Sequence, residues 1–263
     1  MSYVQFLRLR KALTIYGIVV GGLFLIGLTV GHSPDAVFEL SDGSYHTTQS
    51  MTSIPMSGLL FFAAWCAIVF ATVVSTSLNK EYDGVEMVWT KPIARERLAV
   101  FYILLDFAAI IISFLFAAAL SVLAIASIGA SKYLTVDSRT VPTLVIGLGA
   151  AFMWYGLVQG LTAGQRGRGS MVIGISWGAA FLLILLAEAT SGISPPIHLL
   201  STIINIFNPL AYFSSYSLSN YGAHSSPVLP QALAGTEMRS VLTWTIGILG
   251  CAAAIAGWKR LEV

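Results

Sequence analysis

The densest group of charged side chains in this sequence lies in the 18 residues Lys80–Arg97, which read KEYDGVEMVWTKPIARER. Eight of the chain's 26 charged residues (14 Lys and Arg, 12 Asp and Glu) fall there, including the acids Glu81 and Glu86. Apolar runs long enough to cross a bilayer flank the segment on both sides. This mixture of acids, bases and aromatic residues predicts a docking site for another protein.

The same segment predicts a short helix over Glu81–Trp89, because its apolar residues repeat at helical spacing. A break follows at Thr90–Pro92, since the residue before a proline avoids the α region, and Pro92 can then begin the next helix. Arg95 and Arg97 would lie in the first turns of that helix, where cations are mildly unfavourable unless lipid phosphates, nearby acids or an acidic partner offset them. A plain positive-inside loop is the alternative.

No other motif predicts catalysis or a nucleotide site. Gly164–Ser170 reads GQRGRGS, which has the glycine spacing of a phosphate-binding loop but lacks the lysine that would reach the phosphates. The four histidines are scattered, without a Glu or His partner at helical spacing, and no G-x-S-x-G elbow occurs. We therefore expect no catalytic residue, no metal site and no cofactor in this chain.

Three polar residues lie in or beside predicted membrane helices and are candidates for function on that ground. Asp106 lies two turns into a predicted span, where its carboxylate could be hydrated or paired with a basic residue near the inner surface. The alternative is an interfacial acid whose side chain extends to the membrane surface. Gln159 can hydrogen-bond between helices. Glu188 marks the outer end of a span and could face a cavity or the headgroups.

The elements that must position these residues are membrane helices. Of the 263 residues, 56% are apolar and only 10% are charged, whereas soluble domains carry roughly 25% charge. Six segments approach or exceed the roughly 20 apolar residues that a span needs. They are Ala12–Val30, Gly58–Leu78, Leu98–Ile128, Leu144–Ala163, Met171–Ala187 and Val241–Trp258. The fold class expected is an all-α membrane protein with one transmembrane domain over residues 1–263.

The distribution of Lys and Arg predicts that both termini are cytoplasmic. With that orientation, eleven basic residues lie inside, and Lys132, Arg139 and Arg239 lie outside. Residues 2–11 alternate apolar and basic side chains, which predicts a short amphipathic helix at the cytoplasmic interface or simple positive-inside flanking. The charged segment, taken as residues 79–97, is then a cytoplasmic loop. The net charge of +2 and the absence of a basic tract argue against binding of nucleic acid.

The outer segment 188–240 has few charges and is too apolar over much of its length for a solvated loop, while Pro195, Pro196 and Pro209 divide it into pieces too short to span. Irregular backbone at membrane depth persists only where protein or a water-filled cavity covers it. We expect one or two short helices that re-enter the outer leaflet. An exposed loop at residues 214–235 would follow.

Two motifs together resemble those of ABC-2 type permeases, the membrane-spanning subunits of ABC exporters. The first is Glu81-x-x-Gly84-x-Glu86 followed by Thr90-x-Pro92-x-x-Arg95, which resembles that family's cytoplasmic loop. The second is Asn208-Pro209-Leu210-Ala211-Tyr212, which resembles its Asn-Pro-Leu-x-Tyr element before the last span. Two departures from the family pattern are Val85-Glu86 in place of Thr-Leu, and Phe101 or Tyr102 near a usual lysine.

The resemblance implies a permease in the cell membrane that a separate cytoplasmic ATPase drives. That partner would bind ATP and Mg and grip the loop through a docking set: Glu81, Tyr82, Gly84, Val85, Glu86, Trp89, Pro92 and Arg95. A second copy or a related permease would pair with the chain, and Asn208, Pro209 and Tyr212 would belong to an outer gate. Phe152, Trp154, Tyr155 and Trp177 would suit an amphiphilic or lipid-like substrate, or serve as ordinary packing. The alternatives are a membrane-embedded assembly factor and a secondary transporter.

Overall fold

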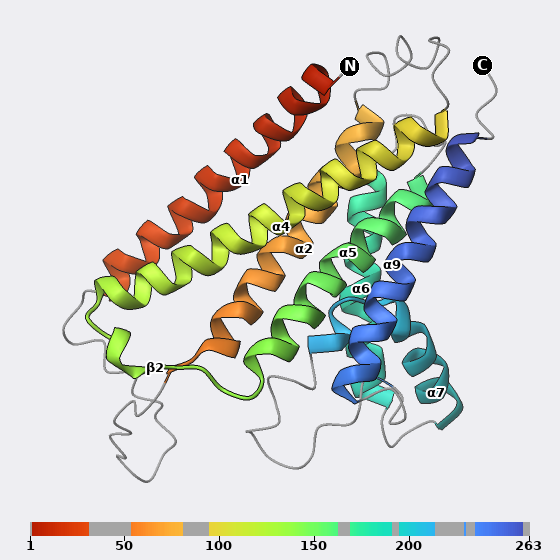
Figure 1. The fold of residues 1–263 in the computed structure, drawn as a ribbon. Helices are drawn as coiled ribbons and strands as arrows, with labels where there is room; N and C mark the ends of the chain where they lie inside the picture. The colour runs from red at the N-terminus through yellow and green to blue at the C-terminus, as the bar shows by residue number, and fades with distance from the viewer. Residues whose placement is uncertain are drawn as a thin grey trace.

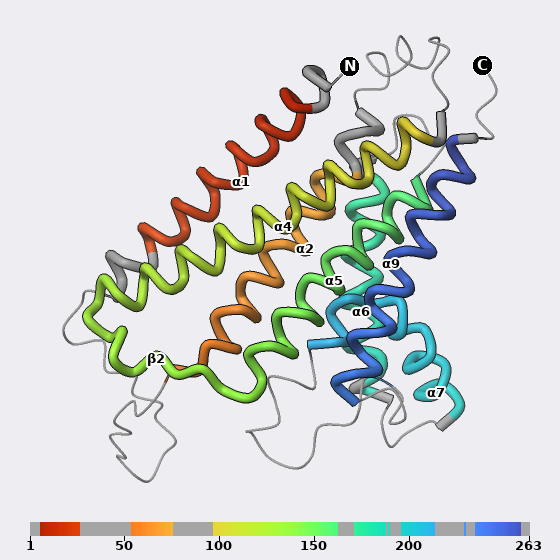
Figure 2. The backbone as a smooth tube through the Cα atoms, viewed as in Figure 1, coloured from red at the N-terminus to blue at the C-terminus, as the bar shows by residue number. Residues whose placement is uncertain are grey.

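The structure, a computed structural model, describes residues 2–31, 54–80, 95–162, 169–190, 195–213, 229 and 235–259 (Figures 1 and 2). The predicted docking helix Glu81–Trp89 and Pro92 lie outside the described residues, as do most of the outer loop and most of the GQRGRGS turn. The remaining candidates all lie on described backbone, although the side chains of Arg95 and Glu188 fall outside the description.

The described chain is a bundle of helices. They are α1 (Ser2–Gly31), α2 (Met56–Lys80), α4 (Arg95–Ser127), α5 (Thr140–Thr162), α6 (Gly169–Thr190), α7 (Pro195–Ile204) and α9 (Thr236–Lys259). Short elements complete it: 3₁₀-helices η1 (Ser131–Tyr133) and η2 (Asn205–Phe207), and strands β1 (Ile54–Pro55) and β2 (Leu134–Thr135). Five helices, α1, α2, α4, α5 and α9, are long and apolar enough to cross a membrane. The expected class, an all-α multi-pass membrane protein, is confirmed.

Helix α1 differs from the expectation of a separate helix at residues 2–11. It runs without a break from Ser2 to Gly31, so those residues form the first turns of the helix that contains the candidate span Phe6–Ile26. The physical reason lies in the sequence, because no proline or glycine occurs before Gly17 and nothing ends the helix. The basic residues are also divided between environments, since Arg8 is buried while Arg10 is exposed.

Local chemistry explains where two long helices end or begin. Helix α4 ends at a left-handed glycine, Gly129 (φ 72°), with Ala130 N bonded to Ile125 O and Gly129 N to Ala126 O at 3.0 Å each. This is the Schellman arrangement, which satisfies the last carbonyls of a helix. Helix α5 begins beside Asp137, whose Oδ1 accepts a 2.6 Å hydrogen bond from Thr140 Oγ1.

A small parallel pairing joins the starts of α2 and α5 at the end of the bundle away from the termini (Figure 1). Strands β1 and β2 pair Ile54 with Leu134 and Pro55 with Thr135. Asp137 strengthens this junction, because its carboxylate also accepts hydrogen bonds from Ser57 N at 3.3 Å and Ser57 Oγ at 2.8 Å. One carboxylate therefore holds the first turns of two helices together.

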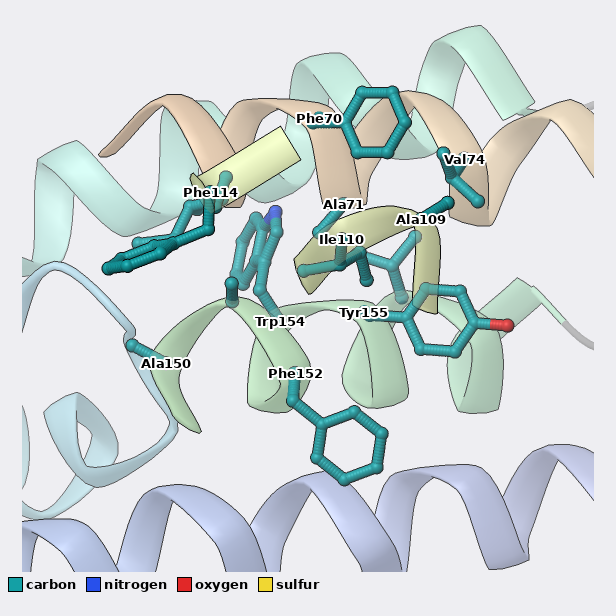
Figure 3. Packing of buried hydrophobic residues seen from close by; sticks show 14 of the residues in the cluster. Phe70, Ala71, Val74, Ala109, Ile110, Phe114, Ala150, Phe152, Trp154 and Tyr155 are labelled. Atoms are coloured by element: carbon teal, nitrogen blue, oxygen red, sulfur yellow. The ribbon is translucent and has the colours of Figure 1, made fainter. Parts of the chain in front are cut away.

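Helix α5 lies between α2 and α9 at the centre of the bundle (Figure 1). Its approach to α9 depends on glycines: a Cβ added at Gly156 would lie 2.4 Å from Gly247 O, and one at Gly250 2.4 Å from Gly156 C. Without Cβ atoms the two backbones can pack directly on each other, as is common between membrane helices. Figure 3 shows Trp154 and Phe152 leaving α5 in different directions, with the Phe152 ring lying toward α9.

Candidate functional site

A buried carboxylate connects three helices near the end of the bundle where the chain termini lie. Asp106 on α4 is fully buried, and its Oδ1 forms an ion pair with Nη2 of the buried Arg8 on α1. Its other oxygen, Oδ2, accepts a 2.9 Å hydrogen bond from the hydroxyl of Tyr155 on α5. The prediction of a basic partner for Asp106 is confirmed, and the alternative of a hydrated carboxylate does not describe this structure.

The pairing has a clear electrostatic reason. An ionised carboxylate or guanidinium alone in hydrocarbon is costly, so such groups pair with each other or face a cavity. Here both Asp106 oxygens have partners, whereas Nε and Nη1 of Arg8 are buried and have no hydrogen-bond partner among the described residues. The carboxylate of Asp106 therefore has more of its hydrogen-bonding capacity satisfied than the guanidinium of Arg8.

A second polar group lies between α2, α5 and α6. Thr72 Oγ1 accepts hydrogen bonds from Trp154 Nε1 at 2.8 Å and Trp177 Nε1 at 3.1 Å, and donates one to Ile68 O at 3.0 Å. A hydroxyl has one donor and two acceptor positions, so these three bonds use its full capacity. Both indoles are thereby fixed against α2, and the two rings meet edge to face at 5.7 Å.

The predicted role of Gln159 as a residue that hydrogen-bonds between helices is confirmed. It is fully buried on α5, and its Nε2 donates a 2.8 Å hydrogen bond to the backbone oxygen of Ser75 on α2. Its Oε1 is buried without a hydrogen-bond partner among the described residues. The contact ties α5 to the half of α2 that leads toward the charged segment.

The segment that follows α6 is held to it by side chains that bond to its backbone. His198 Nδ1 lies 3.1 Å from Ala187 O, Asn205 Nδ2 donates to Leu183 O at 3.1 Å, and Asn208 Nδ2 donates to Ala180 O at 2.8 Å. The three acceptor oxygens lie about one turn apart on one face of α6. As the donor residue number rises from 198 to 208, the acceptor residue number falls from 187 to 180. Residues 198–208 therefore run antiparallel along α6, from the level of Ala187 to that of Ala180, about 10 Å at 1.5 Å per residue.

The turn after η2 is closed by its own polar groups. Asn208 Nδ2 also bonds to Asn205 Oδ1 at 2.9 Å, and Asn208 Oδ1 accepts from Leu210 N at 3.1 Å, which fixes the backbone around Pro209. The fully buried Tyr212 donates from its hydroxyl to Ile206 O at 2.8 Å. Arg239 on α9 donates from Nη1 to Tyr212 O at 3.2 Å, so the turn is tied to the last helix as well.

The structure brings some predicted residues together and separates others. Asn208, Pro209 and Tyr212 share one turn, whereas Asp106 and Gln159 belong to different polar groups, and the Glu188 side chain is not described. Sequence reasoning missed Arg8 as the partner of Asp106, and it missed Thr72. Among the described residues, no three His, Cys, Asp or Glu side chains group as metal ligands.

The aromatic residues that we associated with a substrate are largely structural. Phe152, Trp154 and Tyr155 are buried within the bundle, where Phe152 packs edge to face on Phe107 with a centroid separation of 4.7 Å. Of the four, Trp177 alone is half-buried, and its ring lies against Trp65. The alternative of ordinary membrane packing therefore describes the first three residues.

No family model, curated protein or solved structure matches the chain in comparisons with known proteins. The long apolar helices of the chain define its class, which is an all-α multi-pass membrane protein.

Proposed function

We propose that this chain is the membrane-spanning subunit of an ATP-driven exporter of the ABC-2 type, powered by a separate nucleotide-binding subunit. The observation that carries the proposal is the arrangement around the charged segment. Helix α2 ends at Lys80 and α4 begins at Arg95, both at the end of the bundle where the two termini lie (Figure 1). The segment between them, with its motif Glu81-x-x-Gly84-x-Glu86, would meet the ATPase there.

The proposal includes a sixth span and a re-entrant segment. Helix α6 has 22 residues, about 33 Å at 1.5 Å per residue, which is sufficient for a hydrocarbon core of about 30 Å. The antiparallel run of residues 198–208 along α6 supports re-entry from the outer side. Its polar groups are paired by α6 and by its own turn, as irregular backbone at membrane depth requires.

The location follows from the same arrangement. By the distribution of Lys and Arg in the sequence, the chain would lie in the cell membrane with both termini in the cytoplasm. A second copy or a related permease would complete the transporter. The turn at Asn208, Pro209 and Tyr212 would contribute to an outer gate, while ATP and Mg would bind to the partner subunit.

The test is affinity purification of the tagged chain from its native membranes in mild detergent, followed by identification of co-purifying proteins and assay of ATP hydrolysis. A nucleotide-binding ATPase should be recovered with the wild-type chain. Charge reversal at Glu81→Lys and Glu86→Lys should reduce its recovery, while Lys132→Glu at the other end should leave it unchanged. The proposal fails if no ATPase is recovered with the wild-type chain.

A secondary transporter is the second candidate, and the buried Arg8–Asp106 pair favours it, because intramembrane ion pairs mark many ion-coupled pathways. The two candidates differ in their energy source. Transport that collapses with the ion gradient, and needs no ATPase subunit in proteoliposomes, would support the second candidate and exclude the first.

A further inference from the structure

Helix α1 is the least embedded of the candidate spans. Only 17% of its most apolar 18-residue stretch is buried inside the bundle, compared with 50% for the same length of α2 and 61% for that of α5. It packs chiefly along α4, to which it runs parallel (Figure 2). Its outer side presents large apolar residues such as Ile18 and Leu23, which suit lipid. A helix with so small an interface depends strongly on the few specific contacts that it makes.

Polar contacts join α1 to α4 at two levels within the part of the chain that the structure describes. Arg8 pairs with Asp106, and about two turns further along, the Tyr16 hydroxyl donates a 3.0 Å hydrogen bond to Ser113 O. The Tyr16 ring also packs on Phe70 of α2, with ring centroids 5.0 Å apart. The two contacts differ in kind, because the first joins opposite charges and the second is a neutral bond supported by ring packing.

The ion pair is asymmetric in how well each partner is satisfied. Arg8 lies within two turns of the start of α1, and two of its nitrogens have no hydrogen-bond partner among the described residues. A long arginine side chain near a helix end can extend to headgroups or water if the helix moves. Asp106 would meanwhile keep the hydrogen bond from Tyr155, so its separation from Arg8 would not leave it wholly unpaired.

We infer that the Arg8–Asp106 ion pair is a releasable latch that holds the N-terminal half of α1 on the bundle, with Tyr155 retaining the carboxylate when the latch opens. The two arrangements of α1 then differ in this ion pair and in the packing of its neighbour Leu9, which is buried in the core when the latch is closed. Movement of α1 would then remove one partner of Asp106 on α4, while its hydrogen bond from Tyr155 of the central helix α5 remains. The latch is a property of the chain alone; its use in coupling to an ATPase rests on the proposed function.

The experiment measures the distance between α1 and α4 in the purified full chain in lipid nanodiscs, without any partner protein. Spin labels are placed at the exposed positions Phe6 and Leu104, and in a second sample at Ile18 and Ile112, after replacement of Cys66 and Cys251 by alanine. Pulsed electron–electron double resonance then gives the distribution of distances between the two spin labels. The first pair reports the latch, and the second reports the packing near Tyr16.

The expected result is specific to the ion pair. Arg8→Gln and Asp106→Asn should raise the population at longer Phe6–Leu104 distances by about tenfold, which corresponds to about 1.4 kcal/mol. The matched control Arg10→Gln removes an exposed charge from the same helix and should have no effect. The charge exchange Arg8→Asp with Asp106→Arg should return the distribution toward that of the parent. Tyr155→Phe should not raise the longer population, since the latch itself remains.

Two results would overturn the inference. One is an Arg8→Gln distribution identical to those of the parent and Arg10→Gln. The other is loss of defined distances at both label pairs in Arg8→Gln, which would make the ion pair a requirement for folding and not a latch. Neither result depends on an ATPase, so the latch and the proposed function can fail separately.

Discussion

The hydroxyl of Tyr155 on α5 donates a 2.9 Å hydrogen bond to Oδ2 of Asp106 on α4, the same carboxylate that pairs with Arg8 on α1. Three helices thus meet at one buried acid, and residues 8, 106 and 155 act together although they are far apart in the chain. The contact makes Tyr155 a positioning residue, because it fixes the carboxylate that Arg8 meets.

Tyr155→Phe tests this relationship through stability. Loss of the hydroxyl should lower the free energy of unfolding by roughly 1–2 kcal/mol, because one oxygen of a buried carboxylate loses its donor. Unfolding can be followed with a thiol-reactive dye, since Cys251 is buried and Cys66 is partly buried. Tyr133→Phe, an exposed tyrosine at the other end of α4, is the control and should be neutral. Equal effects of the two variants would contradict the assigned role.

The hydrogen bonds of Asn208 predict a difference between two substitutions. Asn208→Ala removes donors to Ala180 O and Asn205 Oδ1 and should cost about 1–2 kcal/mol. Asn208→Asp should lower stability further, because a carboxylate oxygen would replace Nδ2 and would repel the oxygens of Ala180 and Asn205. The thiol-dye assay measures both variants against Leu199→Ala, an exposed residue of α7. If Asp were tolerated better than Ala at this position, the hydrogen-bond assignment would be wrong.

The close crossing of α5 and α9 predicts opposite outcomes for two glycines. Gly156→Ala places a methyl group 2.4 Å from Gly247 O, so the helices must separate, at a cost of about 1–3 kcal/mol. Gly174→Ala on α6 meets no atom within 4 Å and should stay within about 1 kcal/mol of the parent. The midpoint of unfolding in a denaturing detergent series compares them. A Gly156→Ala protein as stable as the Gly174→Ala protein would contradict the crossing.

Asp137 predicts a dependence of stability on pH. Slight burial opposes its ionisation, but hydrogen bonds from Thr140 and Ser57 outweigh this and lower the pKa of Asp137 below its model-peptide value of 3.8. A group with a depressed folded pKa stabilises the fold above the unfolded pKa and loses that contribution as pH falls through the folded pKa. Asp137→Asn should therefore be less stable than the parent at pH 7, by under about 1 kcal/mol, and the difference should shrink as the pH falls below 3.8 through the folded pKa of Asp137.

Thermal unfolding of the two proteins between pH 7 and pH 3 measures this difference. The gap between the Tm values should narrow only at the acidic end. A gap that is constant over the whole range would show that the carboxylate charge does not matter at the junction of α2 and α5.

The long helices could be predicted from the sequence because their apolar runs are set by the thickness of a bilayer. Asp106 could also be selected, since an acid within an apolar run is conspicuous. Its partner Arg8 could not, because 98 residues separate them and the basic residues near the N-terminus looked alike as positive-inside charges. Only the packing of α1 on α4 distinguishes the buried Arg8 from the exposed Arg10.

The contacts of residues 198–208 show a second limit. The Asn-Pro-Leu motif draws attention to Asn208, but the acceptor of its hydrogen bond is the backbone oxygen of Ala180. Every residue type has a backbone oxygen, so the sequence does not indicate which residue accepts this bond. The same holds for Ser75 O, which receives the hydrogen bond from Gln159. The continuity of α1 was missed for a related reason, since amphipathic alternation indicates which faces differ but not where a helix stops.

The central claim, that an ATPase docks on the segment between α2 and α4, is tested most directly by photo-cross-linking in native membranes. A photoreactive amino acid replaces Tyr82 or Trp89, and, as a control, Val136 at the opposite end of the bundle, where the side chain is 80% exposed. The account predicts adducts from positions 82 and 89 that contain a nucleotide-binding ATPase, and none from position 136. Adducts from 82 and 89 that lack any ATPase, in membranes where the chain is abundant, would contradict it.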